Sequence, residues 1–296
     1  MSLPAQRTRF TLFDLALAAV LAGVGVYFAY RIRVGLDYHW NWSVIPQYLL
    51  RYDPQEGGWR AGLITQGLFT TLRLSFWATL LATLIGTAVG VMRITKGLFL
   101  RMCGRSFVEL IRNMPPLVLI FIFYFFVSDQ IMPVLGLEEL IRSRSQETQD
   151  FLHLLFGPPP LIPPFLSALV TLALYEAAYI AEIVRAGIES IERGQWEASR
   201  ALGMNWLQQM RHIIMPQALA RILPPLAGQF ISAIKDSAIV SIISIQELTF
   251  QGMELMSATY LTFEVWLTVA GLYLLLCLAC SLAVGKLDSW MNRSRV

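Results

Sequence analysis

Six long apolar stretches, separated by polar segments, constrain the fold of this chain more than any other feature. A helix needs about 20 residues to cross roughly 30 Å of hydrocarbon. Only 15% of the 296 residues are charged, against about a quarter in a typical soluble domain. We therefore predict an all-α, polytopic membrane helix bundle with about six transmembrane helices. The stretches cover residues 12–30, 63–92, 106–132, 163–188, 217–244 and 263–285.

The first apolar stretch could be confused with a signal peptide, because Arg7 and Arg9 precede it. It is long, however, and it continues into Tyr30-Arg31-Ile32-Arg33 without a small-x-small cleavage site. We therefore predict a retained transmembrane helix.

The distribution of Lys and Arg predicts the orientation of the chain, because cytoplasmic loops carry an excess of both. One side holds fourteen of them and the other side six. We predict that both termini and the polar segment 190–216 face the cytoplasm. The fourteen are Arg7, Arg9, Arg93, Lys96, Arg101, Arg105, Arg185, Arg193, Arg200, Arg211, Arg221, Lys286, Arg293 and Arg295, and the six are Arg31, Arg33, Arg51, Arg60, Arg142 and Arg144. The net charge of +3 reflects this bias and gives no indication of nucleic-acid binding.

Two loops on the outer side are long. Residues 31–62 are rich in Tyr and Trp, which suits the headgroup interface. Residues 133–162 predict a short amphipathic helix, and the prolines from Pro158 to Pro164 stiffen the return to the membrane. This second loop is either a solvated cap or a docking surface for an extracytoplasmic partner.

Cysteine and histidine predict neither a disulfide framework nor a metal centre. The three cysteines, Cys103, Cys277 and Cys280, are few and scattered. Cys277 and Cys280 form a C-x-x-C inside an apolar run, which is typical of small apolar residues on a helix. The three histidines lie in three different loops, so we expect no shared metal site and no cofactor in this chain.

Small residues recur along the second apolar stretch. Gly86 and Gly90 are four residues apart, and Ala82 lies one turn earlier. This spacing lets helices approach closely in lipid. It predicts either packing within a bundle or a dimer face.

The polar segment 190–216 can be built from local rules. Trp196–Leu202 contains good helix formers, and Gly203 follows where a left-handed C-terminal cap is expected. Asn205 can then cap a second helix, with Gln208 three positions on, as in a capping box. Pro216 should end or bend that helix before the chain re-enters the membrane. We predict a short helix, a glycine hinge and a second helix along the inner membrane face.

The same segment resembles a known motif. Glu197, Ala198, Ser199, Gly203, Ile213 and Pro216 have the spacing of the EAA loop of ABC-importer permeases, E-A-A-x3-G-x9-I-x-L-P, with departures at Ser199 and Met215. The resemblance implies a coupling helix that inserts into a groove of a cytoplasmic ATPase. An ordinary amphipathic connector between two transmembrane helices is the alternative.

Other motifs resemble the permeases of polar-amino-acid ABC importers, over roughly residues 62–290. Tyr179–Ile188 matches the pattern Y-x-A-E-x-x-R-x-G-I, and Ile234–Ser237 matches L-K-D/N-[ST]. Arg112–Phe125 is similar to R-G-T-P-x-L-V-x-x-F-x-x-Y-F, although Asn113 and Met114 replace Gly and Thr. Gly67–Leu72 looks like the start of that family's core.

The resemblance implies a type I ABC-importer permease fold. It assigns residues 62–290 to the permease core, with a periplasmic insertion at about 133–162 and a cytoplasmic coupling loop at about 190–216. Residues 1–61 would form an extra N-terminal transmembrane helix and a periplasmic loop. The extra helix and the insertion exceed the compact five-helix members of the family.

The resemblance also implies partners. The chain contains no G-x-x-x-x-G-K-[ST] phosphate-binding loop, so ATP and Mg would be bound by a separate ATP-binding-cassette ATPase dimer. A second permease subunit, identical or merely similar, would complete the path. A periplasmic solute-binding protein would deliver the amino acid, which would cross the bacterial inner membrane by alternating access.

Ionisable residues at membrane depth are costly, which makes them candidates for function. We expect Glu176 to bind the ammonium group of an amino acid, and Arg73 or Lys235 to bind its carboxylate. Asp236 lies beside Lys235 and is a further candidate. Alternatively, these charges neutralise one another or snorkel.

Two further pairs, Glu109–Arg112 and Glu182–Arg185, have the i,i+3 spacing of structural ion pairs.

Two other classes of protein are alternatives to the importer. An ion-gradient-driven transporter of small polar solutes would show broken helices, for which Pro115-Pro116 and Pro224-Pro225 give slight support. A membrane enzyme is less favoured, because no nucleophile–base or metal constellation is present.

Overall fold

The computed structural model describes residues 12–35, 38–54 and 57–293, which fall into two units, Met1–Asn41 and Trp42–Val296. The first unit contains helix α1, Leu12–Gly35. Its described apolar part, Leu12–Phe28, is shorter than the spans of the second unit, so a membrane crossing by this helix stays a prediction. Arg7, Arg9 and Arg295 of the charge count lie outside the described residues.

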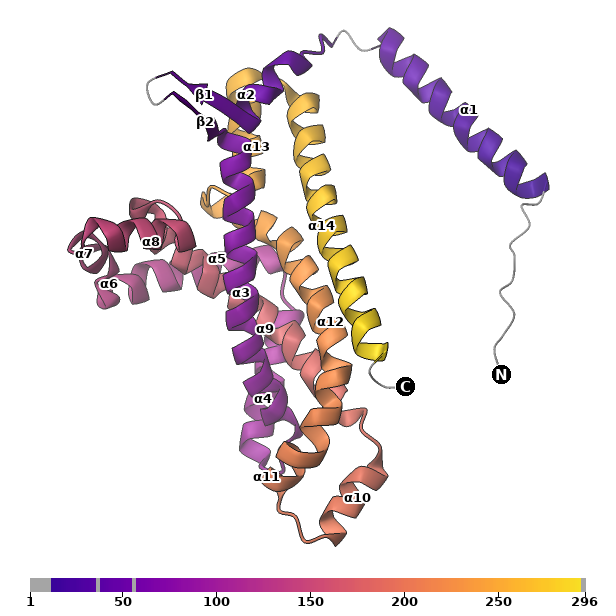
Figure 1. Ribbon diagram of the computed structural model, residues 1–296, viewed down its shortest axis with the longest axis vertical. Helices are drawn as coiled ribbons and strands as arrows, with labels where there is room; N and C mark the ends of the chain where they lie inside the picture. Colours follow the sequence, from indigo (N-terminus) through magenta and orange to yellow (C-terminus); the bar gives the residue numbers. More distant parts are fainter. Residues whose placement is uncertain (1–11, 36–37, 55–56, 294–296) are drawn as a thin grey trace. The chain divides into compact units, whose positions relative to one another are not determined.

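Five helical segments of the second unit are long and apolar enough to cross a membrane (Figure 1). They are Leu63–Ile94 (α3), Pro116–Leu135 (α5 and α6), Pro159–Glu189 (chiefly α9), Trp206–Ile243 (α11, α12 and the turns beside them) and Thr262–Lys286 (within α14). The predicted class, an all-α membrane bundle, is confirmed.

A small β-hairpin lies within residues 50–61 and was not predicted. After a 3₁₀ turn at Trp42–Val44 and helix α2, Ile45–Leu49, strands β1, Leu50–Asp53, and β2, Gly58–Ala61, pair antiparallel. Tyr52 and Trp59 oppose each other across the hairpin, with ring centroids 5.7 Å apart. Such aromatic cross-strand pairs stabilise a two-stranded sheet.

The third apolar stretch does not form one helix, so the predicted span 106–132 is wrong in its start. Helix α4, Leu98–Arg112, ends where the Asn113 N–H bonds to the Glu109 carbonyl. Helix α5, Pro116–Phe126, begins after Pro115. A proline lacks the N–H that a continuous helix requires, and it disfavours helical backbone in the residue before it. A π-helical turn, Val127–Ile131, then leads into α6, Met132–Leu135.

The 133–162 insertion contains two short helices besides α6 where one was predicted. These are α7, Leu137–Arg142, and α8, Gln146–Phe156, and a 3₁₀ turn at Pro159–Leu161 leads into α9, Ile162–Glu189. The indole N–H of Trp77 donates to the Leu155 carbonyl at 3.2 Å, and the rings of Trp77 and Phe156 lie 5.6 Å apart. These contacts hold α8 against α3.

Helix α12, Met215–Asp236, continues through Pro224 and Pro225, so the expected break is wrong. Transmembrane helices tolerate proline, because their surroundings can satisfy the freed carbonyls. A 3₁₀ segment, Ser237–Ile243, follows. The chain then forms α13, Leu248–Thr259, which was not predicted, and α14, Thr262–Arg293.

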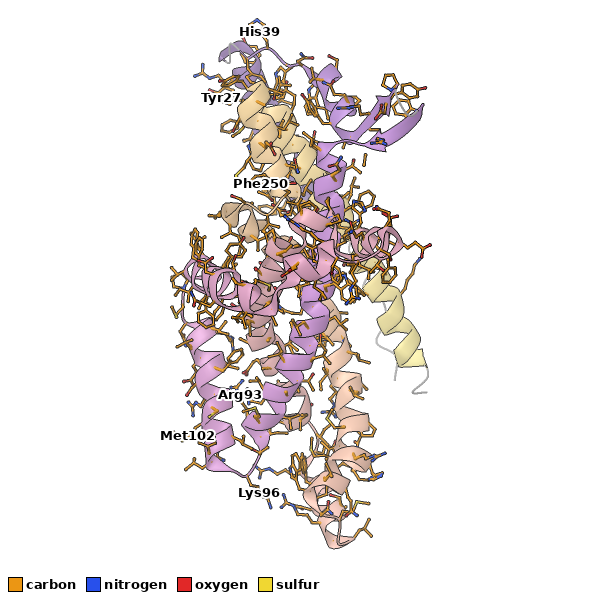
Figure 2. All side chains as sticks on the ribbon, turned by 90° about the vertical axis from the view of Figure 1, so that its left-hand side faces the viewer. Tyr27, His39, Arg93, Lys96, Met102 and Phe250 are labelled. Carbon is orange, nitrogen blue, oxygen red and sulfur yellow. The ribbon has the colours of Figure 1, made fainter. Side chains whose placement is uncertain are left out.

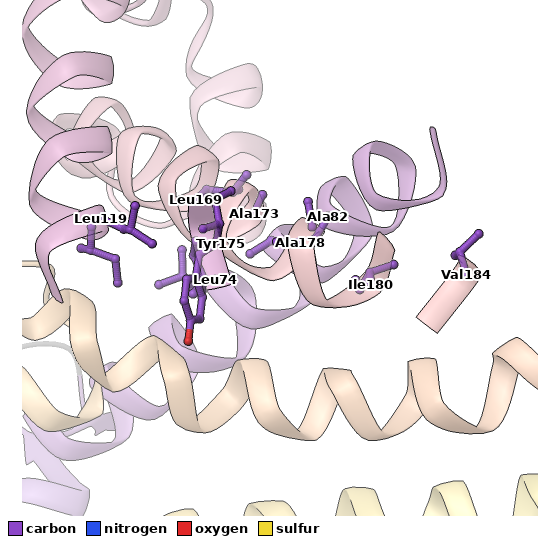
Figure 3. Packing of buried hydrophobic residues seen from close by; sticks show 14 of the residues in the cluster. Leu74, Ala82, Leu119, Leu169, Ala173, Tyr175, Ala178, Ile180 and Val184 are labelled. Carbon is purple, nitrogen blue, oxygen red and sulfur yellow. The ribbon is translucent and has the colours of Figure 1, made fainter. Parts of the chain in front are cut away.

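The core is centred on the packing of α3 against α9. A Cβ added at Gly86 would lie 2.8 Å from the Ala177 carbonyl oxygen, and one at Gly90 would lie 2.9 Å from that of Ala181. The small-residue pattern therefore serves packing within the chain. Figure 3 shows buried side chains of α3, α5 and α9 meeting there, among them Leu74, Leu119 and Ile180.

A buried carboxyl group connects α3, α13 and α14 at the far end of the bundle from α10. Glu247 accepts hydrogen bonds from the Phe250 N–H at 2.8 Å, the Tyr273 hydroxyl at 2.8 Å and the Thr71 hydroxyl at 3.3 Å. The Thr71 oxygen in turn accepts from the Leu248 N–H. In Figure 2, Phe250 lies toward this end, while Lys96 and Met102 lie toward the end that carries α10.

Candidate functional site

The 190–216 segment lies at one end of the bundle, where α10, Arg193–Ala201, leads to α11, Trp206–Gln209 (Figure 1). Gly203 has a φ of 75°, in the left-handed region. Its N–H bonds to the Arg200 carbonyl, and the Met204 N–H bonds to the Ser199 carbonyl. These two bonds form a Schellman cap, so the predicted cap at Gly203 is confirmed.

A capping box starts the next helix, as predicted. The Asn205 side chain accepts from the Gln208 N–H, and the Gln208 side chain accepts from the Asn205 N–H, both at 2.9 Å. Gln209, 4% exposed, donates from Nε2 to the Met204 carbonyl at 2.7 Å. The Schellman cap, the capping box and the Gln209 hydrogen bond therefore all restrain the turn around Gly203.

Pro216 does not end or bend the second helix as predicted. After α11 the backbone widens into a π-helical turn, Met210–Ile214, and continues directly into α12 with Pro216 in its first turn. A π-helical turn is a local adjustment that lets a helix accept a residue without an N–H. Helix α12 is thus continuous with the segment that carries the cap.

The segment has a packed face and an exposed face. Ser199 is 1% exposed and donates from its hydroxyl to the Trp196 carbonyl at 2.9 Å, so a small residue is needed where the motif usually has alanine. Glu197, Ala198, Gly203 and Pro216 are exposed, and Ile213 is half-buried. The sequence reading missed Leu202 and Leu207, which are 76% and 68% exposed beside the turn. Leu202 directly precedes Gly203, and Leu207 lies in α11.

A second cluster lies inside the bundle, where α9 meets α12. Glu176 is fully buried and accepts from Gln229 Nε2 at 2.6 Å, while its Oε1 has no hydrogen-bond partner among the described residues. The half-buried Asp236 carboxyl lies within hydrogen-bonding reach of Glu176. The cluster brings together two of the predicted site residues, Glu176 and Asp236.

The two predicted carboxylate partners lie elsewhere. Lys235 precedes Asp236 but its side chain is exposed. Arg73 is half-buried and lines a cavity beside α8, together with Phe156 and Gly157. No described contact brings Arg73 to Glu176.

A charged network ties α3, α4 and α9 together near the α10 end. Glu182 forms ion pairs with Arg93, Arg185 and Arg112, the last at 3.7 Å. The predicted pair Glu182–Arg185 is confirmed. The pair Glu109–Arg112 is wrong, because Glu109 pairs with Arg105 at 2.6 Å, while the Arg112 guanidinium lies over the Tyr179 ring. The packing of α4 against α9 brings Arg112 to Glu182.

The described residues bring no three His, Cys, Asp or Glu side chains together as metal ligands. The cysteines among them are free, and Cys277 and Cys280 lie on α14 without further ligands.

Comparison with known proteins places these features in a family. The model of the family described as "Binding-protein-dependent transport system inner membrane component" matches residues 82–293. The "Probable glutamine ABC transporter permease protein GlnM" of Bacillus subtilis is 35% identical over 77% of this chain and 93% of that protein. The "Glutamate/aspartate import permease protein GltJ" of Escherichia coli K12 is 30% identical over 80% of this chain and 89% of that protein.

A solved structure is also similar. The "Crystal structure of an amino acid ABC transporter with histidines" is 31% identical, covers 77% of this chain and 93% of its own, and superposes with a TM-score of 0.61. The methionine transporter MetNI, at 20% identity and a TM-score of 0.58, shares the fold.

Proposed function

The chain belongs to the family of binding-protein-dependent transport system inner membrane components, and from that membership we propose that it is the permease subunit of an ATP-driven importer of polar amino acids. Its relatives are permeases named for glutamine and for glutamate and aspartate. ATP hydrolysis takes place in separate ATPase subunits, which bind the 190–216 segment. The permease itself catalyses no covalent chemistry.

One observation carries this proposal, the doubly capped turn with its exposed leucines. The Schellman cap at Gly203 and the capping box at Asn205 make the turn rigid. Leu202 and Leu207 then present apolar surface to an ATPase groove. Because the turn is continuous with α12, a displacement of the turn moves a helix that carries Asp236. The segment thus supports mechanical coupling between the ATPase and the interior cluster.

This geometry supports a transport cycle by alternating access. Two permease subunits, identical or similar, would hold two such turns against an ATPase dimer. ATP binding would bring the turns together and open the path outward, where a periplasmic binding protein delivers the amino acid. Glu176, with Asp236 beside it, would receive the ammonium group. Both termini would face the cytoplasm in this multi-pass inner-membrane protein.

The test replaces the exposed leucines and measures ATPase recovery. The permease is co-expressed with its ATPase, purified through a tag on the permease, and assayed for bound ATPase. Leu202→Glu and Leu207→Glu should each lower the recovered ATPase at least about tenfold, since docking would bury an unpaired carboxylate. Leu154→Glu, at the similarly exposed Leu154 of α8, is the matched control. Unchanged recovery in both variants would refute this docking site.

A further inference from the structure

A cavity of about 400 Å³ opens between the first half of α3, the end of α8 and the bend before α13. This volume is within the range of small-molecule sites. The ionisable residues that line it are Arg60, Arg73 and His153, and no Asp or Glu is among the described lining residues. The cavity therefore favours an anionic group.

Of the two arginines that line the cavity, Arg73 is the one available to bind an anionic group. Arg60 is paired with Asp53 at 3.5 Å, whereas no hydrogen bond or ion pair of Arg73 is found within the described ranges. A guanidinium that has lost part of its hydration without gaining a partner is unfavourable. Its planar donors match a carboxylate in bidentate geometry.

The Arg73 guanidinium lies against the end of α8. Gly157 is buried and has a φ of 101°. A Cβ placed there would lie 3.6 Å from Arg73 Nη1, so Arg73 extends beside bare backbone. Another residue of the lining, Gln251, is 3% exposed, and its Oε1 has no partner among the described residues. This acceptor is unsatisfied until a ligand supplies an N–H.

The position of Arg73 along α3 places the cavity in the outer half of the bundle, in the orientation proposed above. Arg73 lies ten residues after Leu63, the first residue of this span, which corresponds to roughly 15 Å along the helix. No described contact joins it to Glu176, so the cavity is distinct from the Glu176 cluster.

We propose that this cavity is a second, outer binding site for the transported amino acid, in which Arg73 binds the α-carboxylate. The proposal rests on the importer function proposed above. The amino acid would bind here between its release by the binding protein and its arrival at Glu176. Phe69 and Phe156 supply apolar walls for its side chain.

The test measures binding to the complete transporter in nanodiscs of phosphatidylcholine, without the binding protein. The probes are L-glutamine, L-glutamate and L-arginine, each compared with its α-carboxamide. Arg73→Gln should weaken binding of the acid that the transporter takes up about tenfold or more, because a charged hydrogen-bonded pair is lost. It should leave the carboxamide unchanged, and Arg105→Gln, on the exposed surface of α4, should change neither.

Each other outcome is decisive. If Arg73→Gln weakens the binding of the amino acid and of its carboxamide equally, or weakens neither, the outer site is refuted. ATP-driven uptake by the wild type would still support the importer function in that case. Absence of any amino-acid uptake by the wild type would instead refute the proposed function. If Arg73→Gln fails to assemble, Arg73→Lys should still weaken the acid selectively. The wild type should bind the amino acid more tightly than its α-carboxamide. If phosphatidylglycerol in the nanodisc abolishes this difference in affinity, a lipid headgroup occupies the cavity and the amino-acid assignment fails.

Discussion

Two fully buried glutamates differ in how their oxygens are satisfied, and this difference separates a structural role from a binding role. Glu247 receives hydrogen bonds at both oxygens, from Phe250, Tyr273 and Thr71. Glu176 receives one at Oε2 from Gln229, and its Oε1 receives none from the described residues. A buried acceptor left without a partner costs free energy, so Glu176 is the better candidate for a ligand.

Glu176→Gln should lower amino-acid uptake about tenfold or more, since one charged hydrogen bond to the substrate is lost. The variant keeps the volume of the side chain and an acceptor for Gln229, so the thermal midpoint should not fall. The measurement is uptake by reconstituted proteoliposomes, with thermal unfolding as the control. Unchanged uptake would remove Glu176 from the substrate path.

Glu247 should make stability depend on pH. Burial raises the pKa of Glu247 to about 6, against the opposing effect of hydrogen bonds from Thr249, Phe250, Tyr273 and Thr71. The pKa in an unfolded chain is about 4.3. The folded protein thus keeps a proton that the unfolded chain loses, and this stabilisation is present below pH about 4.3 and is lost as the pH rises through about 6.

The variant Glu247→Gln lacks this titration. The free energy of unfolding of the variant, minus that of the wild type, should therefore rise by about 2 kcal/mol as the pH is raised from about 4.3 to about 7. Thermal unfolding in detergent across that range checks the trend. A stability difference that stays constant with pH would contradict the raised pKa.

At the level of elements, sequence reading succeeded where the determinants are local. The cap at Gly203 and the capping box at Asn205 each depend on a few adjacent residues. It failed where contacts with other helices determine the local structure. The break between α4 and α5 lies inside an apolar run, and α13 has its first turn tied to α3 through Thr71 and Glu247. The Glu182 network likewise depends on the approach of α3 and α4 to α9.

Gly203→Val should uncouple the transporter, because a β-branched residue is strongly disfavoured at a φ of 75°. The distorted turn would misplace Leu202 and Leu207, so ATP hydrolysis in the complex should fall severalfold while the permease still inserts into the membrane. Gly194→Ala is the matched control, since a Cβ there meets nothing within 4 Å. Gly203→Asn should be tolerated, because asparagine adopts left-handed backbone readily. Equal activity in the Val and Ala variants would show that the turn does not couple.

At the scale of the whole molecule, the apolar pattern was sufficient to predict the class of fold and five of its spans. The motifs were sufficient to predict the family. The local ion pair Glu182–Arg185 was predictable. The surroundings of the substrate-site candidates were not, since α9 and α12 bring Glu176 to Asp236, whereas Arg73 lines the cavity beside α8. The continuity of α12 through Pro224 and Pro225 removes one of the two helix breaks that supported an ion-driven transporter, whereas the break at Pro115-Pro116 is present.

Amino-acid uptake by proteoliposomes that hold the permease, its ATPase and its binding protein tests whether ATP drives this permease. Uptake should require ATP on the ATPase side and should be unaffected by an ionophore. Uptake that persists without ATP and collapses with the ionophore would contradict ATP-driven transport.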